Sequence, residues 1–198
     1  MEIYDENNKL IPHLNVEYIE QELASKYIKP HHKVLELGAR YGSVSIITNR
    51  IVEDKSSHYV VEPDKEVWEA LEGNMKRNNC NFNIIKGIIG SGKHRLVGEG
   101  YAKRTITDPS YGESSIQTFN LPDIDFDTLI VDCEGFLETF YNENTELFNK
   151  LELMIIECDE PQNCDYQYLF QEFAKLNFVI VEHKKAYCEY YVFEKKHL

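Results

Sequence analysis

The sequence predicts a doubly wound α/β fold whose sheet has seven strands, mostly parallel, and ends in an antiparallel hairpin. Short apolar runs alternate along the chain with segments in which apolar residues recur at helical spacing. Strands that are apolar over their whole length are typical of a parallel sheet covered by helices on both faces. The last two runs are too close in sequence for a helical crossover, so they are expected to pair as an antiparallel hairpin.

The elements are expected in a regular order. A helix is predicted on the apolar stripe of Val16, Ile19, Leu23 and Tyr27, with Asn15 as its N-cap. Strands are predicted at residues 33–37, 57–62, 82–85, 127–131, 153–156, 178–181 and 189–193. Helices are predicted between them, at residues 44–51, 67–75, 137–141 and 166–176. A glycine follows the first of these strands and a proline the second, which marks where each strand ends.

Residues 87–125 are the irregular part of the predicted fold. This segment has five glycines in its first fourteen residues and separates the third and fourth strands by about forty residues. Loops of this length are usually functional or contain small strands, and residues 94–98 and 115–119 are candidates. The segment is either a solvated insertion or a lid that binds the substrate. It also carries the densest local positive charge, at Lys93, His94, Arg95, Lys103 and Arg104.

Charge and length exclude several classes of protein. The chain has 198 residues, with 34 acidic and 21 basic side chains and a formal net charge of −13. This charge would repel a phosphate backbone or an anionic membrane surface, so neither nucleic acid nor membrane is expected as a partner. Five scattered cysteines suit reduced thiols and the N-terminus has no signal-peptide pattern, so a cytoplasmic location is expected. The length suits one domain over residues 1–198, in which residues 1–30 form a helical extension.

The run ELGARYG at residues 36–42 is a candidate ligand-binding turn. Open α/β sheets bind ligands at the carboxyl ends of their strands, where the strand order reverses, and glycines let the backbone approach the ligand. The spacing differs from the GxGxxG fingerprint of dinucleotide binding, and an acid stands two residues before the first glycine. A carboxylate at this place favours a ligand with a cationic end. The predicted contacts are Glu36, Gly38, Ala39, Tyr41 and Gly42.

A second acid, Glu62, ends the next predicted strand and is followed by Pro63. A carboxylate at this place can accept hydrogen bonds from both hydroxyls of a ribose. A ligand that has a ribose and a cationic amino-acid end but no phosphate is S-adenosylmethionine. The two motifs together therefore predict this cofactor, with Glu62 and Pro63 among its contacts.

Four segments of the sequence resemble the FkbM family of class I methyltransferases: VLELGARYGSVSI, VVEPDKEVWEALEGNMKRNN, DTLIVDCEG and LMIIECDEP. The resemblance covers roughly residues 33–184. It implies a Rossmann-like class I methyltransferase fold and O-methylation of a hydroxyl on a sugar, a glycan or a small hydroxylated metabolite. Asp132, Glu134 and Gly135 match the D-x-E-G motif of the family, and Asp132 is also a predicted cofactor contact.

The sequence departs from the family pattern at two places. Ile130 stands where the family usually has a lysine, two residues before the aspartate, so the polar role of that lysine is absent or supplied elsewhere. The end of the third strand lacks the acid that many class I enzymes offer to the adenine amino group. Adenine binding is therefore expected to use backbone groups and apolar packing, with Ile88 as a candidate.

Methyl transfer to a hydroxyl needs an in-line nucleophile and a base that takes its proton. Carboxyl groups at the ends of the fourth and fifth strands qualify by position, although each has a structural alternative as a helix-terminal or cofactor-contacting acid. The predicted catalytic residues are Asp132, Glu134 and Glu157, with Asp159, His94 and His183 as further candidates. The same acids could instead hold Mg²⁺ or Mn²⁺, and the predicted metal ligands are Asp132, Glu157 and Asp159.

Two alternatives to a methyltransferase stay open. A methyltransferase-like fold kept only for binding is mildly favoured by Ile130, and an NAD-dependent oxidoreductase is disfavoured by Glu36 and the missing middle glycine. Cys133 and Cys158 are expected to be small buried residues that pack behind the acids. The sequence specifies neither the acceptor hydroxyl nor the oligomeric state.

Overall fold

The main sheet has seven strands, and its order reverses between β3 and β10. The computed structural model describes residues 1–12, 17–107, 110 and 116–197. The order across the sheet is β12-β13-β11-β10-β3-β4-β5. The strands span β3 Val34–Leu37, β4 His58–Val61, β5 Asn83–Ile85, β10 Thr128–Val131, β11 Leu153–Cys158, β12 Phe178–Lys185 and β13 Glu189–Lys195. Adjacent strands from β5 to β11 are parallel, while β13 runs antiparallel to β11 and β12, so the predicted fold class is confirmed.

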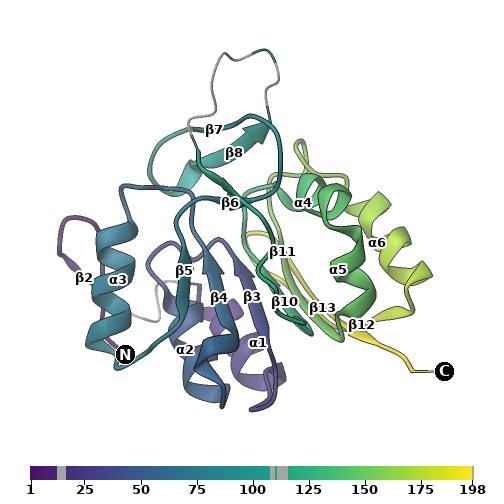
Figure 1. Ribbon diagram of the computed structural model, residues 1–198, viewed down its shortest axis with the longest axis horizontal. Helices are drawn as coiled ribbons and strands as arrows, with labels where there is room; N and C mark the ends of the chain where they lie inside the picture. The colour runs from purple at the N-terminus through teal and green to yellow at the C-terminus, as the bar shows by residue number, and fades with distance from the viewer. Residues whose placement is uncertain (13–16, 108–109, 111–115, 198) are drawn as a thin grey trace.

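Helices cover both faces of this sheet (Figure 1). The first face packs against α1 Tyr18–Tyr27, α2 Ser43–Ile51 and α3 Trp68–Arg77. The second packs against α4 Leu137–Glu143, α5 Thr145–Lys150 and α6 Tyr166–Lys175. Within the described residues, no helix combines the length and the apolar character needed to cross a membrane.

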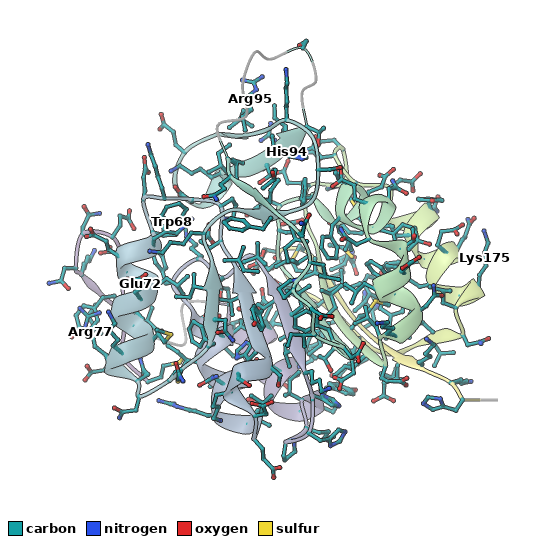
Figure 2. All side chains as sticks on the ribbon, in the orientation of Figure 1. Trp68, Glu72, Arg77, His94, Arg95 and Lys175 are labelled. Carbon is teal, nitrogen blue, oxygen red and sulfur yellow. The ribbon has the colours of Figure 1, made fainter. Side chains whose placement is uncertain are left out.

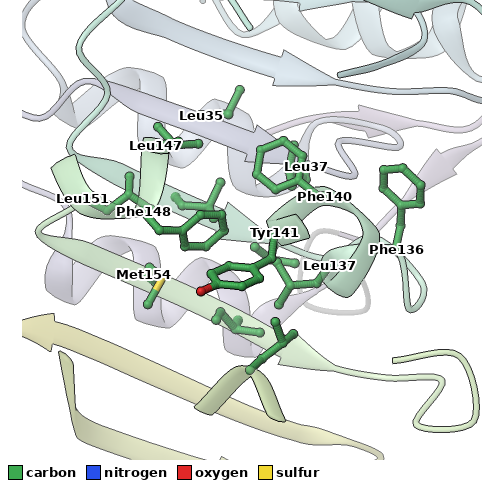
Figure 3. Close-up of a cluster of buried hydrophobic side chains, with 14 of the residues drawn as sticks. Leu35, Leu37, Phe136, Leu137, Phe140, Tyr141, Leu147, Phe148, Leu151 and Met154 are labelled. Atoms are coloured by element: carbon green, nitrogen blue, oxygen red, sulfur yellow. The ribbon is translucent and has the colours of Figure 1, made fainter. Parts of the chain in front are cut away.

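Side chains of each strand alternate between these two faces. On β3, Leu35 and Leu37 pack in the cluster under α4, α5 and α6, whereas Val34 packs in the cluster under α1 and α2. Figure 3 shows Phe140 and Phe148 in the cluster under α4, α5 and α6, and both are fully buried. Each buried aromatic ring contributes about 1.5–3 kcal/mol through removal of apolar surface from water. This packing fixes the strand ends that form the site.

The N-terminal residues contain an unpredicted hairpin. β1 Ile3–Tyr4 pairs antiparallel with β2 Leu10–Ile11 before α1 begins. Asn74 of α3 holds the hairpin, because its side chain accepts from the Tyr4 N–H and donates to the Tyr4 carbonyl, both at 2.9 Å. The predicted N-cap Asn15 and the apolar Val16 lie outside the described residues.

The segment 87–125 contains small strands over the carboxyl ends of the main sheet (Figure 1). β6 Ile88–Ile89 pairs parallel with β9 Thr118–Phe119, and β7 His94–Val97 pairs antiparallel with β8 Arg104–Thr107. The two small strands expected from the sequence are therefore confirmed as β7 and β9. We refer to residues 87–125, in their described part, as the insert.

Candidate functional site

A cavity of about 1250 Å³ lies at the carboxyl ends of the main strands, against the insert. Its lining comes from the ends of β3, β4, β10 and β11, the turn between β12 and β13, the start of α1, and the insert. Figure 2 shows His94 and Arg95 of the insert above the strand ends. The cavity thus lies at the reversal of strand order, which is where open α/β sheets bind ligands.

Gly38 brings the end of β3 directly against the turn after β10. Its φ is 86°, and a Cβ at this position would lie 1.5 Å from the backbone oxygen of Asp132. The Gly38 N–H donates to the Val61 carbonyl at 3.0 Å, and the Asp132 N–H donates to the Leu37 carbonyl at 2.9 Å. The ends of three strands are therefore held together at a point where only glycine fits.

Glu62 forms part of the cavity wall just after β4 and is only 5% exposed. Its two carboxylate oxygens accept hydrogen bonds from the backbone N–H groups of Arg40 and Asp64, each at 2.7 Å. Burial raises the pKa of Glu62 to about 7, although both backbone N–H groups act to lower it. Because a carboxylate can accept about four hydrogen bonds, the fixed oxygens retain capacity for a diol.

The apolar part of the cavity lining comes from the insert and from residues near α4. Ile88 and Ile89 of β6 are buried, and Leu96 of β7 adjoins them in the lining. Phe136 and Phe140 line the cavity as well. These side chains provide an apolar surface suited to a flat ring.

Lys103 attaches the insert to the sheet beside Glu62. Its ammonium nitrogen lies 2.8 Å from Asp64 Oδ2 and 2.5 Å from Glu66 Oε2, and its side chain is 15% exposed. Asp64 is itself buried, so it depends on this cation.

Replacing Lys103 with methionine is expected to loosen the insert. The buried Asp64 carboxylate would lose its cation, which should cost about 1–3 kcal/mol, and amide exchange in β7 and β8 should accelerate. Hydrogen–deuterium exchange checks this, with Lys86→Met as the control, because the Lys86–Glu72 pair is exposed on both sides. Equal exchange rates in the two variants would contradict the attachment.

Another part of the cavity is strongly acidic. Asp132 lies in this part of the lining together with five acids that interact with it electrostatically or lie within 4.8 Å of it: Glu17, Glu20, Glu134, Glu157 and Asp159. Burial raises the pKa of Glu17 to about 7, that of Glu134 to about 8 and that of Glu20 to about 10. Burial and the nearby Glu157 carboxylate also raise the pKa of Asp132 well above its usual range. A cationic ligand would stabilise the ionised forms of these acids.

Asp132 belongs to two acidic triads in this region. Its carboxylate joins Glu20 and Glu157 in one and Glu134 and Asp159 in the other, with the oxygens of each triad within 4.8 Å of one another. The predicted metal set of Asp132, Glu157 and Asp159 is therefore divided between the two triads.

Strained backbone is concentrated around the cavity. Seven non-glycine residues in the described part of the chain have positive φ. Four of them line the cavity: Glu17, Arg40, Glu134 and Glu160. Such conformations cost of order 1 kcal/mol each and persist where surrounding structure enforces them, as at functional sites.

Four predicted cofactor contacts do not line the cavity, which corrects the interpretation of residues 36–42. Glu36 points to the α2 side of β3, where it accepts from Ser45 Oγ at 2.6 Å and lies 3.5 Å from His58 Nε2. Ala39 and Tyr41 are buried in the cluster under α3, and Gly42 precedes α2 with a φ of 80°. Residues Glu36, Ala39, Tyr41 and Gly42 therefore build the turn, while Gly38 and Arg40 reach the cavity.

The histidine candidates also lie outside the lining. His94 is 1% exposed, with ring nitrogens 2.5 Å from the Ser91 carbonyl and 3.1 Å from Thr107 Oγ1. His183 on β12 stacks on Tyr191 with ring centroids 4.4 Å apart. Both rings thus have structural contacts, and the cavity offers carboxyl groups as candidate bases instead.

The structure shows where Ile130 and the two cysteines next to the acids lie. Ile130 is buried in the cluster under α1 and α2, so it cannot replace the polar role of a lysine. Cys133 and Cys158 pack against the hydrophobic cluster under α4, α5 and α6, and both also line the cavity. Burial raises the pKa of both thiols. Both thiols are therefore neutral, and all five cysteines are free.

Glu17 and Glu20 line the cavity but were not predicted from the sequence. Glu20 is 2% exposed and lies between Ile19 and Leu23, both buried on α1. The sequence could have indicated Glu20, because this acid is next to Ile19 in the apolar stripe of the predicted helix. A side chain in that position lies at the edge of the buried helix face.

The fold is similar to that of known methyltransferases and of other Rossmann-like proteins. No protein-family model matches the sequence, and no curated protein does. A protein of the NADB-Rossmann superfamily from Streptococcus agalactiae aligns with a TM-score of 0.57 at 10% identity, over 90% of this chain and 68% of that chain. A putative O-methyltransferase from Klebsiella pneumoniae aligns with a TM-score of 0.56 at 12% identity, over 92% and 81%. Trm5 of Methanocaldococcus jannaschii, in complex with adenosine, aligns with a TM-score of 0.55 at 16% identity, over 94% and 50%. At these identities the similarity establishes the Rossmann-like fold alone.

Proposed function

We propose that the protein is an S-adenosylmethionine-dependent methyltransferase. The observation that carries the proposal is one cavity with a diol acceptor, Glu62, an apolar surface at Ile88, and a cluster of acids around Asp132. The ribose and adenine of the cofactor suit the first two. Its sulfonium and ammonium groups suit the third, because carboxylates stabilise adjacent positive charge. Gly38 lies between them and gives backbone access.

We further propose that the methyl group goes to an acceptor hydroxyl. The base would be one of three cavity-lining carboxyls, Asp132, Glu134 and Glu157. Glu134 has a carboxyl pKa near 8, which suits proton transfer around neutral pH. A sugar, glycan or small hydroxylated metabolite as the acceptor, and membership of the FkbM family, are parts of this proposal that rest on the sequence resemblance.

The alternatives carry less support. A dinucleotide needs bare backbone amides for its pyrophosphate, whereas this cavity has the acidic group around Asp132. Glu62 suits the ribose of either cofactor and does not discriminate between them. A binding module without catalysis would have no need of several buried carboxyls with raised pKa values beside the cofactor.

Cofactor binding separates these proposals. Saturating S-adenosylhomocysteine should raise the melting temperature by about 5–10 °C. A ligand at 100 times its Kd adds about 2.7 kcal/mol to the free energy of unfolding, and for a chain of this size each kcal/mol raises the melting temperature by about 2–4 °C. NAD should leave it unchanged. Differential scanning fluorimetry makes the comparison, and stabilisation by NAD alone would overturn the proposed function. Transfer of labelled methyl groups to a panel of deoxyhexoses and short oligosaccharides then tests the acceptor.

A further inference from the structure

A buried triad of acids joins α1 to the sheet. Glu20 comes from α1, Asp132 follows β10, and Glu157 lies near the end of β11. One carboxylate oxygen from each lies within 4.8 Å of the other two. The alternation of side chains explains the meeting. Ile130 and Ile155 pack in the cluster under α1, and the residue two positions further along each chain segment, Asp132 or Glu157, faces the same way.

Glu20 is the unusual member of this triad. It is 2% exposed, and neither of its carboxylate oxygens receives a hydrogen bond. A buried polar group without a donor costs about 1–3 kcal/mol, and more when it is charged. Glu20 lines the cavity, and its protonated form can share its proton with the neighbouring Glu157 carboxylate. A cation that displaces this proton would satisfy the Glu20 oxygens in the ionised form.

We propose that Glu20, Asp132 and Glu157 bind one divalent cation. Hard cations such as Mg²⁺, Mn²⁺ and Ca²⁺ prefer carboxylate oxygens and lie about 2.0–2.6 Å from them. Oxygens that are up to about 5 Å apart can share an ion at the longer of these distances. The cation neutralises the mutual repulsion of the three acids, and the cavity leaves room for water or an acceptor oxygen as further ligands.

The other triad, Asp132 with Glu134 and Asp159, is the weaker candidate. Asp159 Oδ1 already accepts from the Gly135 N–H at 3.0 Å and from the Tyr166 hydroxyl at 3.1 Å, so only Oδ2 is buried without a partner, whereas both oxygens of Glu20 are. In the first triad, Glu157 uses one oxygen, Oε1, for Cys188 and Tyr190, at 2.8 and 3.3 Å. The hydrogen bonds to Oε1 orient the Glu157 carboxylate, as partners of metal ligands commonly do.

Titration with Mn²⁺ tests this site directly. The purified chain, dialysed against EDTA and then into metal-free buffer, is expected to bind one Mn²⁺ per chain, measured by electron paramagnetic resonance of the free ion. Glu20→Gln and Asp132→Asn should each weaken binding at least about tenfold. Glu22→Gln is the matched control, because Glu22 is an acid of the same helix in an exposed pair with Lys184, and it should bind as the wild type does.

Two outcomes would overturn the cation site: no stoichiometric Mn²⁺ binding by the wild type, or unchanged affinity in Glu20→Gln. Circular dichroism verifies that each variant is folded, and Glu20→Asp, which withdraws the carboxylate by one methylene, serves as a second variant with reduced affinity expected. Stabilisation by S-adenosylhomocysteine in EDTA is measured in parallel. A chain that binds this ligand but no Mn²⁺ contradicts the cation site alone, and the reverse result contradicts the proposed cofactor alone.

Discussion

Replacing Gly38 with alanine is expected to destabilise the protein by about 2–4 kcal/mol and to abolish cofactor binding. The new Cβ would lie 1.5 Å from the Asp132 backbone oxygen. The Cβ is rigidly attached to the Gly38 Cα and the oxygen belongs to the main chain, so no side-chain rotation can relieve the contact. The left-handed backbone conformation adds about 1 kcal/mol, and overpacking adds about 1–3 kcal/mol. The turn after β10 must therefore move, and it carries Asp132 out of position.

Gly100→Ala is the matched control for this substitution. Gly100 also has positive φ, at 56°, but a Cβ there would meet nothing within 4 Å. Gly100→Ala should therefore lower the free energy of unfolding by only about 1 kcal/mol, through the left-handed backbone conformation. Chemical denaturation measures the free energy of unfolding of both variants, and calorimetry measures their affinity for S-adenosylhomocysteine. Equal losses in the two variants would show that the contact between Gly38 and Asp132 has no special importance.

The sheet could be predicted because its determinants are local. Apolar runs specify strands, helical spacing specifies the elements between them, and the short connection before β13 requires an antiparallel partner. The order reversal then places residues that follow different strands, such as Gly38 and Asp132, at one edge. Glu62 could be located for the same reason.

The remaining features of the site depend on contacts between distant segments. Glu36 was expected at the ligand, but the alternation of β3 turns it toward Ser45 and His58, a direction that the motif alone does not reveal. Glu20 enters the site only because α1 packs over β10 and β11. The sequence shows an acid beside an apolar stripe without showing which strands that stripe will cover.

The same distinction changes the meaning of the net negative charge. As a total, it argues against anionic partners, whereas in the structure six acids of one cavity create a local preference for cations. Burial raises the pKa of Glu17, Glu20 and Glu134, and each ionised acid opposes the ionisation of its neighbours. A bound cation would therefore increase the ionisation of these acids and stabilise the folded protein near neutral pH.

Glu62→Ala is expected to weaken adenosine binding by about 1.5–3 kcal/mol, because the ribose hydroxyls lose a charged acceptor. This corresponds to about a tenfold to hundredfold increase in the dissociation constant. Isothermal titration calorimetry at pH 8 measures it, and Glu69→Gln, an exposed acid on α3, is the control. Unchanged affinity in Glu62→Ala would exclude Glu62 as the ribose acceptor.

The pH dependence of this affinity provides a sharper test of the same residue. Burial raises the pKa of Glu62 to about 7 in the free protein, whereas hydrogen bonds from a ribose favour the ionised carboxylate. Between about pH 4.5 and 7, Glu62 is therefore protonated in the folded protein and ionised in the unfolded chain. The free energy of unfolding is highest below about pH 4.5 and falls as the pH rises through 7. Ligand binding must release that proton below pH 7, so wild-type affinity should rise with pH and level off above about 8. Adenosine is the preferred probe because it is uncharged and does not respond to the acids around Asp132 as a sulfonium would. A wild-type curve that is flat from pH 5.5 to 8.5, or the same slope in Glu62→Ala, would assign the ribose to another acceptor.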